Sequence, residues 1–255
     1  MRLGIIGGTA MPKLVSDSIN SERIDLLSVD TKWGSVPMTC IKQPDGNEIF
    51  IIQRHHGDND GFTSPHLIEH RANIDALSGA GADAILAICS VGTIPQDFPP
   101  GSIGYATQFI DLTGIAVTFS NRQAEFTSMT NPFDEKMNSI LDRVLSDLQP
   151  NMHLARNYWL TQGPQFETIA EINAIEKLGG DVVGMTMPRE CKLAAEREIP
   201  YSALLIASNW AAGRDPDDSS KDLDHHEVSA TAAQYLDSVV DCILAVLEFT
   251  TTQAQ

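Results

Sequence analysis

Short apolar runs alternate with longer amphipathic segments along most of the 255-residue chain. Runs such as LGII at 3–6 and ADAILAICSVGT at 82–93 have the length and continuous hydrophobicity of strands buried within a sheet. In segments such as 168–180, apolar residues recur with the period of a helix. The pattern predicts strands at 3–6, 37–41, 48–53, 82–93, 101–113, 157–164, 181–185 and 201–213, and helices at 66–81, 132–148, 168–180, 188–198 and 228–249.

Turn residues and periodicity set the expected boundaries. The cluster KQPDGN, between 37–41 and 48–53, predicts a β-hairpin. Pro132 is predicted to begin the helix at 132–148. Spacing predicts an inward face made by Leu67, Ile74 and Leu77 in one helix, and by Ile169, Ile172, Ile175 and Leu178 in another.

Strands that alternate with helices predict a mostly parallel sheet with helices on both faces. No internal repeat or low-complexity linker interrupts the pattern, so we expect one domain over residues 1–255. Ligands in such sheets bind where strands end in loops. The strand ends are therefore the expected location of a site.

An excess of acidic residues limits the kinds of partner that the protein can bind. The 34 Asp and Glu residues against 17 Lys and Arg give a formal net charge of −17. The electrostatic field of this negative net charge repels nucleic acids and anionic membranes, so we expect neither as a partner. The apolar part of MRLGIIGGTA is too short for a secretion signal, and no stretch reaches the length of a membrane span, which predicts a cytoplasmic protein.

The cysteines and histidines show no spacing typical of metal ligands, so no metal site is expected. Cys40, Cys89 and Cys242 lie in apolar runs and are expected to be buried thiols. No GxGxxG, Walker or GxSxG pattern is present, which argues against a nucleotide cofactor and against a serine nucleophile.

Five strand ends carry small or polar residues: GGTA (7–10), QRHHG (53–57), CSVGT (89–93), GMTM (184–187) and SNWAAG (208–213). The hydroxyls of Thr9, Ser90 and Thr186 are suited to bind one oxyanion, together with backbone N–H groups made accessible by the neighbouring glycines. Arg54 would add a fixed positive charge to this site. In so acidic a protein, an anion needs such a local site.

The segment GPQFETIAEI at 163–172 places Phe166 beside Glu167 at a predicted helix start. Carboxylates are favoured at helix N-termini, so capping alone explains Glu167. The alternative is a flat ligand that takes a ring face from Phe166, an acceptor from Glu167 and an amide from Asn209. Together with the anion site, this alternative describes a pocket for phosphate and a heterocycle.

These motifs resemble the trimeric purine nucleoside phosphorylase and methylthioadenosine phosphorylase family. The resemblance extends over nearly the whole chain and rests on GIIGGT, QRHHG followed by HRANIDAL, QFIDLT, TQGPQFETIAE, KLGGDVVGMTMPRE and SNWAAG. It implies an α/β fold of the phosphorylase/hydrolase type, with a central mixed sheet partly closed into a barrel and flanked by helices. It also implies homotrimers, or dimers of trimers, that use phosphate as co-substrate and need no metal or organic cofactor.

The same resemblance implies a role for each motif residue. Phosphate would be held by Thr9, Arg54, His55, Ser90 and Thr186. The nucleoside would be held by Phe166, Glu167, Met185, Asn209, Val91, Gly92, Ala211, His225 or His226, and by Phe126 from the neighbouring subunit. Glu167, Asn209 and His55 are the candidate catalytic residues. The implied reaction cleaves a glycosidic bond with phosphate to give a free base and a sugar 1-phosphate.

The base and the 5′ substituent are separate questions. An ionised Glu167 can only accept, which suits the N1–H of a 6-oxopurine, and the Asn209 amide can donate to O6. Adenine-directed family members have aspartate at both the Asn209 and Ala211 positions. Inosine and guanosine are therefore expected, with S-methyl-5′-thioinosine or S-methyl-5′-thioadenosine as alternatives because the start of the chain looks more like the methylthioadenosine branch.

Two further alternatives belong to other functional classes. One is a degenerate family member that binds aromatic ligands without turnover. The other is a nucleosidase that uses water, although Arg54 with three hydroxyl residues favours phosphate.

Overall fold

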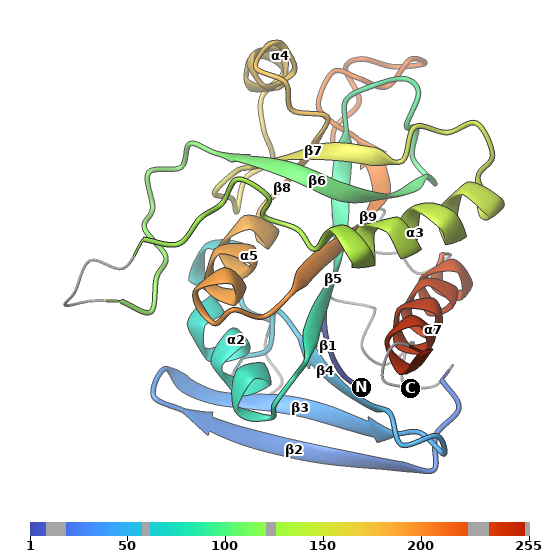
Figure 1. Cartoon of the computed structure of the whole chain (residues 1–255). Coiled ribbons are helices and arrows are strands. Elements are labelled where there is room, and N and C mark those ends of the chain that lie inside the picture. The colour runs from blue at the N-terminus through green and yellow to red at the C-terminus, as the bar shows by residue number, and fades with distance from the viewer. Residues whose placement is uncertain (9–18, 58–61, 121–125, 224–234, 253–255) are drawn as a thin grey trace.

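The computed structural model describes residues 1–8, 19–57, 62–120, 126–223 and 235–252 (Figure 1). Its strands are β1 (Arg2–Gly7), β2 (Arg23–Thr31), β3 (Gly34–Lys42), β4 (Glu48–Gln53), β5 (Ala84–Thr93), β6 (Ile103–Asp111), β7 (Ala155–Leu160), β8 (Val182–Gly184) and β9 (Tyr201–Trp210). Its α-helices are α2 (His70–Gly79), α3 (Glu135–Leu148), α4 (Ile169–Lys177), α5 (Met187–Glu196) and α7 (Leu236–Thr252), and Pro65–Leu67 forms a 3₁₀ turn.

The strands form one mixed sheet in the order β2-β3-β4-β1-β5-β8-β7-β6-β9. An additional pairing between β5 and β9 closes β5, β8, β7, β6 and β9 into a barrel. Strand β5 belongs to both parts, because it pairs with β1 along its first half and with β8 at its end. The expected α/β fold, with a mixed sheet partly closed into a barrel and flanked by helices, is confirmed.

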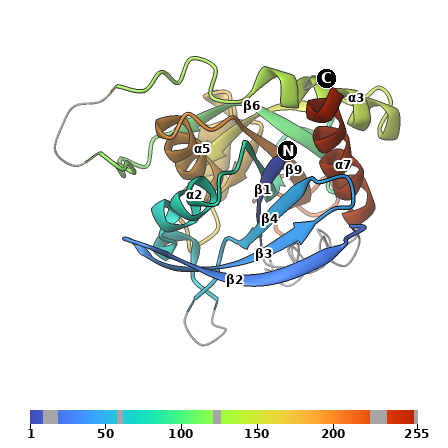
Figure 2. The ribbon, with the colours of Figure 1, turned by 60° about the horizontal axis from the view of Figure 1, so that its bottom comes forward.

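Side chains alternate along β5 between two hydrophobic cores, as the period of a strand requires. Ile85 and Cys89 belong to the core that includes residues of α2 and α5. Leu86 and Ile88 belong to the core that includes residues of α3 and α7. Figures 1 and 2 show these two helix pairs on opposite sides of β5. A strand buried on both faces reads as a continuous apolar run, which explains why β5 was predictable.

Two helices begin later than predicted. Helix α2 begins at His70, and Leu67 in the preceding 3₁₀ turn is 66% exposed, so its predicted inward position is wrong. Helix α3 begins at Glu135 rather than at Pro132, because the Asp134 carboxylate caps it by accepting from the Met137 N–H at 2.8 Å. In both cases the local geometry of the preceding turn decides the boundary.

The predicted face of α4 is also shorter than expected. Ile172 and Ile175 are buried, but Ile169 and Leu178 are 50% and 61% exposed. Helix α4 lies at the periphery (Figure 1), and the sheet residues Trp159 and Val183 pack with its buried isoleucines. Only the middle of the helix therefore contributes to the core.

Strand β2 was not predicted. It is the edge strand, pairs only with β3 in the described sheet, and is largely exposed, with Leu26 at 84%. Its apolar residues are divided between its two faces, with Ile24 and Leu26 on one and Leu27 and Val29 on the other. Of these, Val29 packs against the core, so no single period-2 pattern marks the strand.

The thiols behave as expected: Cys40, Cys89 and Cys242 are buried, and Cys191 is buried as well. No described helix combines the length and the hydrophobicity that a membrane crossing requires.

Candidate active site

The strand ends that carry the candidate residues meet near the end of β5. Gly7 of β1 pairs with both Gln53 of β4 and Ile88 of β5. Gly92 of β5 pairs with Val183 of β8 and with Asn209 of β9. The register of the sheet therefore brings QRHHG, CSVGT, GMTM and SNWAAG to the same end of the barrel.

Ser90 interrupts the burial of β5. It is exposed, whereas every other residue of the strand, including Val91 and Gly92, is buried. Ser90 pairs with Ile206 of β9 on one edge of β5. The other edge is unpaired between Ile88, where the pairing with β1 ends, and Gly92, where the pairing with β8 begins, so Ser90 lies at a gap in the sheet. The hydroxyl is thus accessible to a ligand at the point where the strand ends converge.

The amide of Asn209 is oriented by its neighbours. Its Nδ2 donates to the Trp210 carbonyl at 2.7 Å, and its Oδ1 accepts from the Ser208 hydroxyl at 3.0 Å. Nδ2 carries two hydrogens and Oδ1 has two lone pairs, so each retains capacity for one more hydrogen bond. Buried Ala211 adds no polar side chain beside it.

Gly92 allows a close approach to this amide. A Cβ at Gly92 would lie 3.1 Å from Cγ2 of Val183 and 3.4 Å from Nδ2 of Asn209. A larger residue would therefore press on the amide that the site presents.

A cavity of about 360 Å³ opens beside Asn209, within the size range of small-molecule sites. Its polar lining includes Ser208, Asn209, Asp215, Asp217, Asp218, Lys221 and Asp222. Because carboxylates predominate among these charged side chains, this part of the site suits a neutral ligand better than an anion.

Glu167 does not cap helix α4. Thr168 is the N-cap, and its hydroxyl accepts from the Glu171 N–H at 3.2 Å while the Glu171 carboxylate accepts from the Thr168 N–H at 2.8 Å. This reciprocal pair is a capping box and satisfies the helix start without Glu167. Glu167 instead accepts a hydrogen bond from the Thr161 hydroxyl at 2.6 Å. The capping explanation of Glu167 is therefore wrong.

The side chain of Glu167 is partly buried. Burial raises the pKa of its carboxyl group, and the Thr161 hydroxyl opposes that rise. Phe166 is 39% exposed. The turn before it packs on Met185, because a Cβ at Gly163, whose φ is +69°, would lie 2.5 Å from the Met185 sulfur. The GPQFET and GMTM segments are thus in contact.

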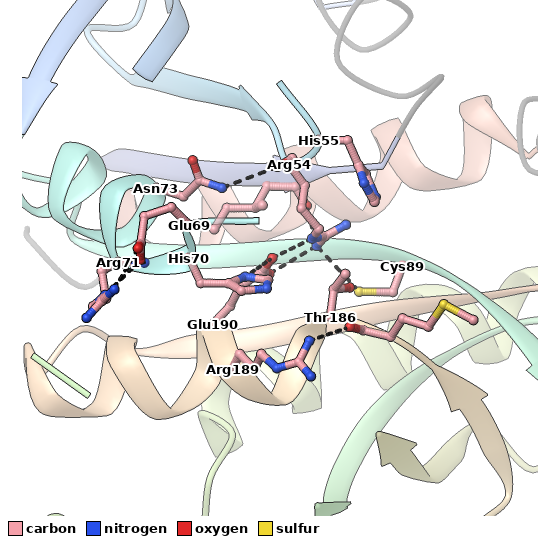
Figure 3. A network of polar contacts seen from close by, with 12 residues as sticks. Arg54, His55, Glu69, His70, Arg71, Asn73, Cys89, Thr186, Arg189 and Glu190 are labelled. Carbon is pink, nitrogen blue, oxygen red and sulfur yellow. Dashed lines mark hydrogen bonds and ion pairs between the residues drawn. The ribbon is translucent and has the colours of Figure 1, made fainter. Parts of the chain in front are cut away.

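Arg54 is a buried cation whose hydrogen bonds are mostly occupied within the protein (Figure 3). Nε and Nη2 both donate to the Glu190 carboxylate, Nη2 at 3.0 Å. Nη1 donates to the Ile88 carbonyl and Nη2 also to the Ile6 carbonyl, each at 3.2 Å. One Nη1 hydrogen remains, on an atom 3.9 Å from where a Cβ of Gly8 would lie. Arg54 is thus a neutralised member of an ion pair rather than an unpaired fixed charge.

Glu190 is the centre of this buried network. It accepts from the Tyr201 hydroxyl at 3.0 Å, and Nδ1 of His70 lies 3.5 Å from its carboxylate. Burial alone would raise the pKa of Glu190, but the Arg54 charge lowers it. Burial alone would lower the pKa of Arg54, but the Glu190 charge raises it. Both groups are therefore ionised at neutral pH.

His55 has a defined tautomer. Its Nδ1 lies 2.9 Å from the Thr63 carbonyl, which can only accept, so Nδ1 carries a hydrogen and Nε2 of the neutral ring is an acceptor. Burial, together with the Arg54 charge, lowers the pKa of His55 to about 4, so the ring is neutral at pH 7. His56 is held differently, with Nε2 2.7 Å from Oδ1 of Asn73 on α2.

Thr186 stands at the start of α5. It is buried, and its hydroxyl makes no hydrogen bond to cap the helix. Arg189, one turn later, donates from Nη1 to the Met185 carbonyl at 2.9 Å (Figure 3), and its Nη2 is buried without a hydrogen-bond partner among the described residues. Arg189 thereby fixes the backbone next to Thr186, at a helix N-terminus where an anion is favoured.

Four candidate residues are not placed in the described site. Thr9, His225 and His226 lie outside the described residues. Phe126 is 97% exposed, in a segment that also exposes Leu112 and Ile115.

The site residues predicted from the sequence do not include Thr161, His70, Arg189 or Glu190. Glu190 pairs with Arg54 across 136 residues, a separation that leaves no local signal. The single available cue was its place in GMTMPRE, within a segment already under consideration. Within the described residues, no three His, Cys, Asp or Glu side chains are grouped to hold a metal ion.

Comparison with known proteins identifies similar chains. Residues 2–248 match the family described as the Phosphorylase superfamily. The chain is 32% identical over 255 residues to the 6-oxopurine nucleoside phosphorylase of Pyrococcus furiosus, covering 96% of this chain and 92% of that protein. It is 34% identical over 215 residues to the probable S-methyl-5′-thioinosine phosphorylase of Methanopyrus kandleri, covering 84% of this chain and 80% of that protein.

Solved structures share the fold. The methylthioadenosine phosphorylase of Schistosoma mansoni, in complex with adenine, superposes with a TM-score of 0.86 at 22% identity, over 99% of this chain and 92% of that one. At this identity, the likeness concerns the fold alone.

Proposed function

The chain belongs to the phosphorylase superfamily, and from this premise we propose that it cleaves 6-oxopurine nucleosides, inosine and guanosine, with phosphate to give the free base and ribose 1-phosphate. The similarity to the Pyrococcus furiosus enzyme over nearly the full length of both chains supports this substrate class.

The observation that carries the proposal is the carboxylate of Glu167. Thr168 and Glu171 already cap the start of α4, so the helix does not need the Glu167 carboxylate. Burial of that carboxylate is unfavourable, as its raised pKa shows, and the fold alone does not explain why an acid stands there. A carboxylate accepts from N1–H of hypoxanthine or guanine, whereas N1 of adenine is itself an acceptor and would repel it. Glu167 thus supports a 6-oxopurine in the site.

Asn209 and Ala211 support the same base. The remaining Nδ2 hydrogen of Asn209 can donate to O6, and its Oδ1 can accept from protonated N7. A donor at O6 is what a 6-oxopurine needs, and buried Ala211 adds no carboxylate that would repel that oxygen.

We propose that phosphate binds near Arg54, His55, Ser90 and Thr186, with Thr9 as a further donor. The accessible hydroxyl of Ser90 and the uncommitted hydroxyl of Thr186 at a helix N-terminus support this location. Arg54 would contribute one Nη1 hydrogen. The acceptor nitrogen of His55 would bind the P–OH group of hydrogen phosphate, since this tautomer cannot donate from Nε2.

The chemistry follows from the charges that develop. As the glycosidic bond breaks, the ribosyl carbon becomes cationic and the base gains negative charge. A phosphate held beneath the sugar stabilises the cation and then captures it, so positioning and electrostatics supply the acceleration. The amide of Asn209 would stabilise the departing base. We propose that no metal or organic cofactor takes part.

A second candidate is the cleavage of S-methyl-5′-thioinosine, which has the same base. The similarity to the Methanopyrus kandleri protein favours it. The two candidates differ only at the 5′ position, for which His225 and His226 are the proposed contacts.

We further propose a cytoplasmic homotrimer, or a pair of trimers, in which each subunit lends Phe126 to its neighbour. Phe126 is 97% exposed, and Leu112 and Ile115 are exposed as well. Several exposed large apolar side chains support a partner surface there, because such patches mark protein–protein contacts.

The test is a nucleoside screen with and without phosphate. Inosine cleavage should require phosphate and yield ribose 1-phosphate, and inosine or guanosine, or their 5′-methylthio analogues, should be preferred to the corresponding adenosines. Asn209→Asp should move the preference toward 6-amino purines, because a carboxylate repels O6 and accepts from the amine. Equal rates without phosphate, with free ribose as product, would identify a hydrolase instead.

A further inference from the structure

Thr161 connects the sheet to the base-binding carboxylate. It directly follows β7, and its N–H donates to the Gly184 carbonyl at the end of β8 at 2.9 Å, so its backbone is fixed to the barrel. Its hydroxyl donates to Oε1 of Glu167 at 2.6 Å, while the other available acceptor, the Gly184 carbonyl, is 3.4 Å away. The shorter contact identifies Glu167 as the partner of this hydroxyl.

Glu167 has few other restraints. It lies in the loop before α4, outside the capping box made by Thr168 and Glu171. A glutamate carboxylate on several rotatable bonds loses rotamer freedom when it is held in one position, so a ligand that needs it there would otherwise bear that cost. In a partly buried site, the carboxylate is also more easily protonated than in water.

We infer that Thr161 is a positioning residue for the proposed reaction: its hydroxyl holds Oε1 of Glu167, so that Oε2 of the ionised carboxylate accepts from N1–H of the base. The inference rests on the proposed 6-oxopurine specificity. A hydroxyl that donates to one oxygen stabilises the ionised form, which is an acceptor only, and thereby disfavours adenine with its bare N1.

The experiment compares three variants with the wild type. Thr161→Val removes the hydroxyl and keeps nearly the same shape, and Thr161→Ser keeps the hydroxyl. Thr107→Val is the matched control, because Thr107 is a half-buried strand threonine whose hydroxyl makes one long contact, 3.5 Å to the Arg156 carbonyl. The kcat and KM for inosine are measured across pH 5–8 at saturating phosphate, and the melting temperature of each variant is recorded.

Thr161→Val should lower kcat/KM for inosine by roughly tenfold, the size expected when a hydrogen bond to a charged group is lost. The acidic limb of its pH profile should move to higher pH, because the lost donor favoured the ionised carboxylate. Thr161→Ser should restore most of the activity and the profile, and Thr107→Val should match the wild type. If Thr161→Val does not fold, Thr161→Ala provides the same comparison.

A second measurement separates positioning from general damage. In a Glu167→Gln background, Thr161→Val should lower kcat/KM for inosine only slightly further, because the two residues act through one interaction. Additive losses, or an unchanged acidic limb in Thr161→Val, would overturn the positioning role while leaving the proposed function intact. A wild type that prefers adenosine to inosine would overturn both.

Discussion

The ion pair of Arg54 with Glu190 changes what a substitution at Arg54 should do. Arg54 was expected chiefly to bind phosphate, but its removal leaves the Glu190 carboxylate buried and unpaired. Arg54→Ala should therefore destabilise the fold by about 3–5 kcal/mol, beyond any effect on phosphate. Urea unfolding measures this.

A double variant provides the control for that prediction. Arg54→Met with Glu190→Gln removes both charges and should recover part of the lost stability, because no unpaired charge remains. If Arg54→Ala kept the wild-type unfolding midpoint and only raised KM for phosphate, the ion pair would contribute nothing to folding.

His55 gives the protein a predictable pH dependence. Its pKa is lowered from 6.5 to about 4 by burial and the Arg54 charge. As the pH falls from 6.5 toward 4, the unfolded chain binds a proton at this position and the folded protein does not, so the free energy of unfolding should decrease over that window. His55→Gln should make the decrease shallower in urea unfolding measured at several pH values.

His70 should also make the free energy of unfolding decrease as the pH falls, because burial lowers its pKa as well. His70→Gln should therefore also reduce the slope. A wild-type stability that is flat from pH 6.5 to 4 would contradict the neutral state of both histidines in the folded protein.

At the scale of the element, the start of α4 separates capping from ligand binding. Thr168→Ala removes the capping box and should cost about 1 kcal/mol of stability, with the preference for inosine over adenosine unchanged. Glu167→Gln should keep the wild-type melting temperature and lower kcat/KM for inosine by about tenfold, since a neutral amide replaces a charged acceptor.

The two variants are controls for each other, because they change adjacent residues of one segment. Melting temperature and the ratio of catalytic efficiencies for the two nucleosides are measured on both. A Glu167→Gln protein that melts early with its base preference intact would return Glu167 to a structural role.

At the scale of the whole molecule, the proposed trimer predicts a site that one chain cannot complete. Light scattering should give a multiple of three subunits. Phe126→Ala should raise KM for the nucleoside by up to about tenfold, through loss of an aromatic contact, and leave phosphate affinity nearly unchanged. Leu148→Ala, at another exposed apolar residue, should change neither. A fully active monomer would rule out the shared side chain.

The sequence by itself determined the elements whose residues are buried on both sides or follow a strict period. The continuous apolar run of β5, the helical spacing of Ile172 and Ile175 and the hairpin of β3 and β4 were all predictable, because burial imposes those patterns locally. The motif residues of the candidate site could also be named, since strand ends and glycine turns are visible in the chain.

Only the tertiary structure decided which of those residues remain available to a ligand. Arg54 forms an ion pair with Glu190, 136 residues away in the chain. Thr168 caps helix α4 in place of Glu167, whose carboxylate accepts a hydrogen bond from Thr161. Hydrogen bonds between distant segments depend on how the barrel closes, and no local pattern encodes them. The edge strand β2 was missed for a different reason: it is largely exposed and carries no single period-2 pattern, so it appeared only through its pairing with β3.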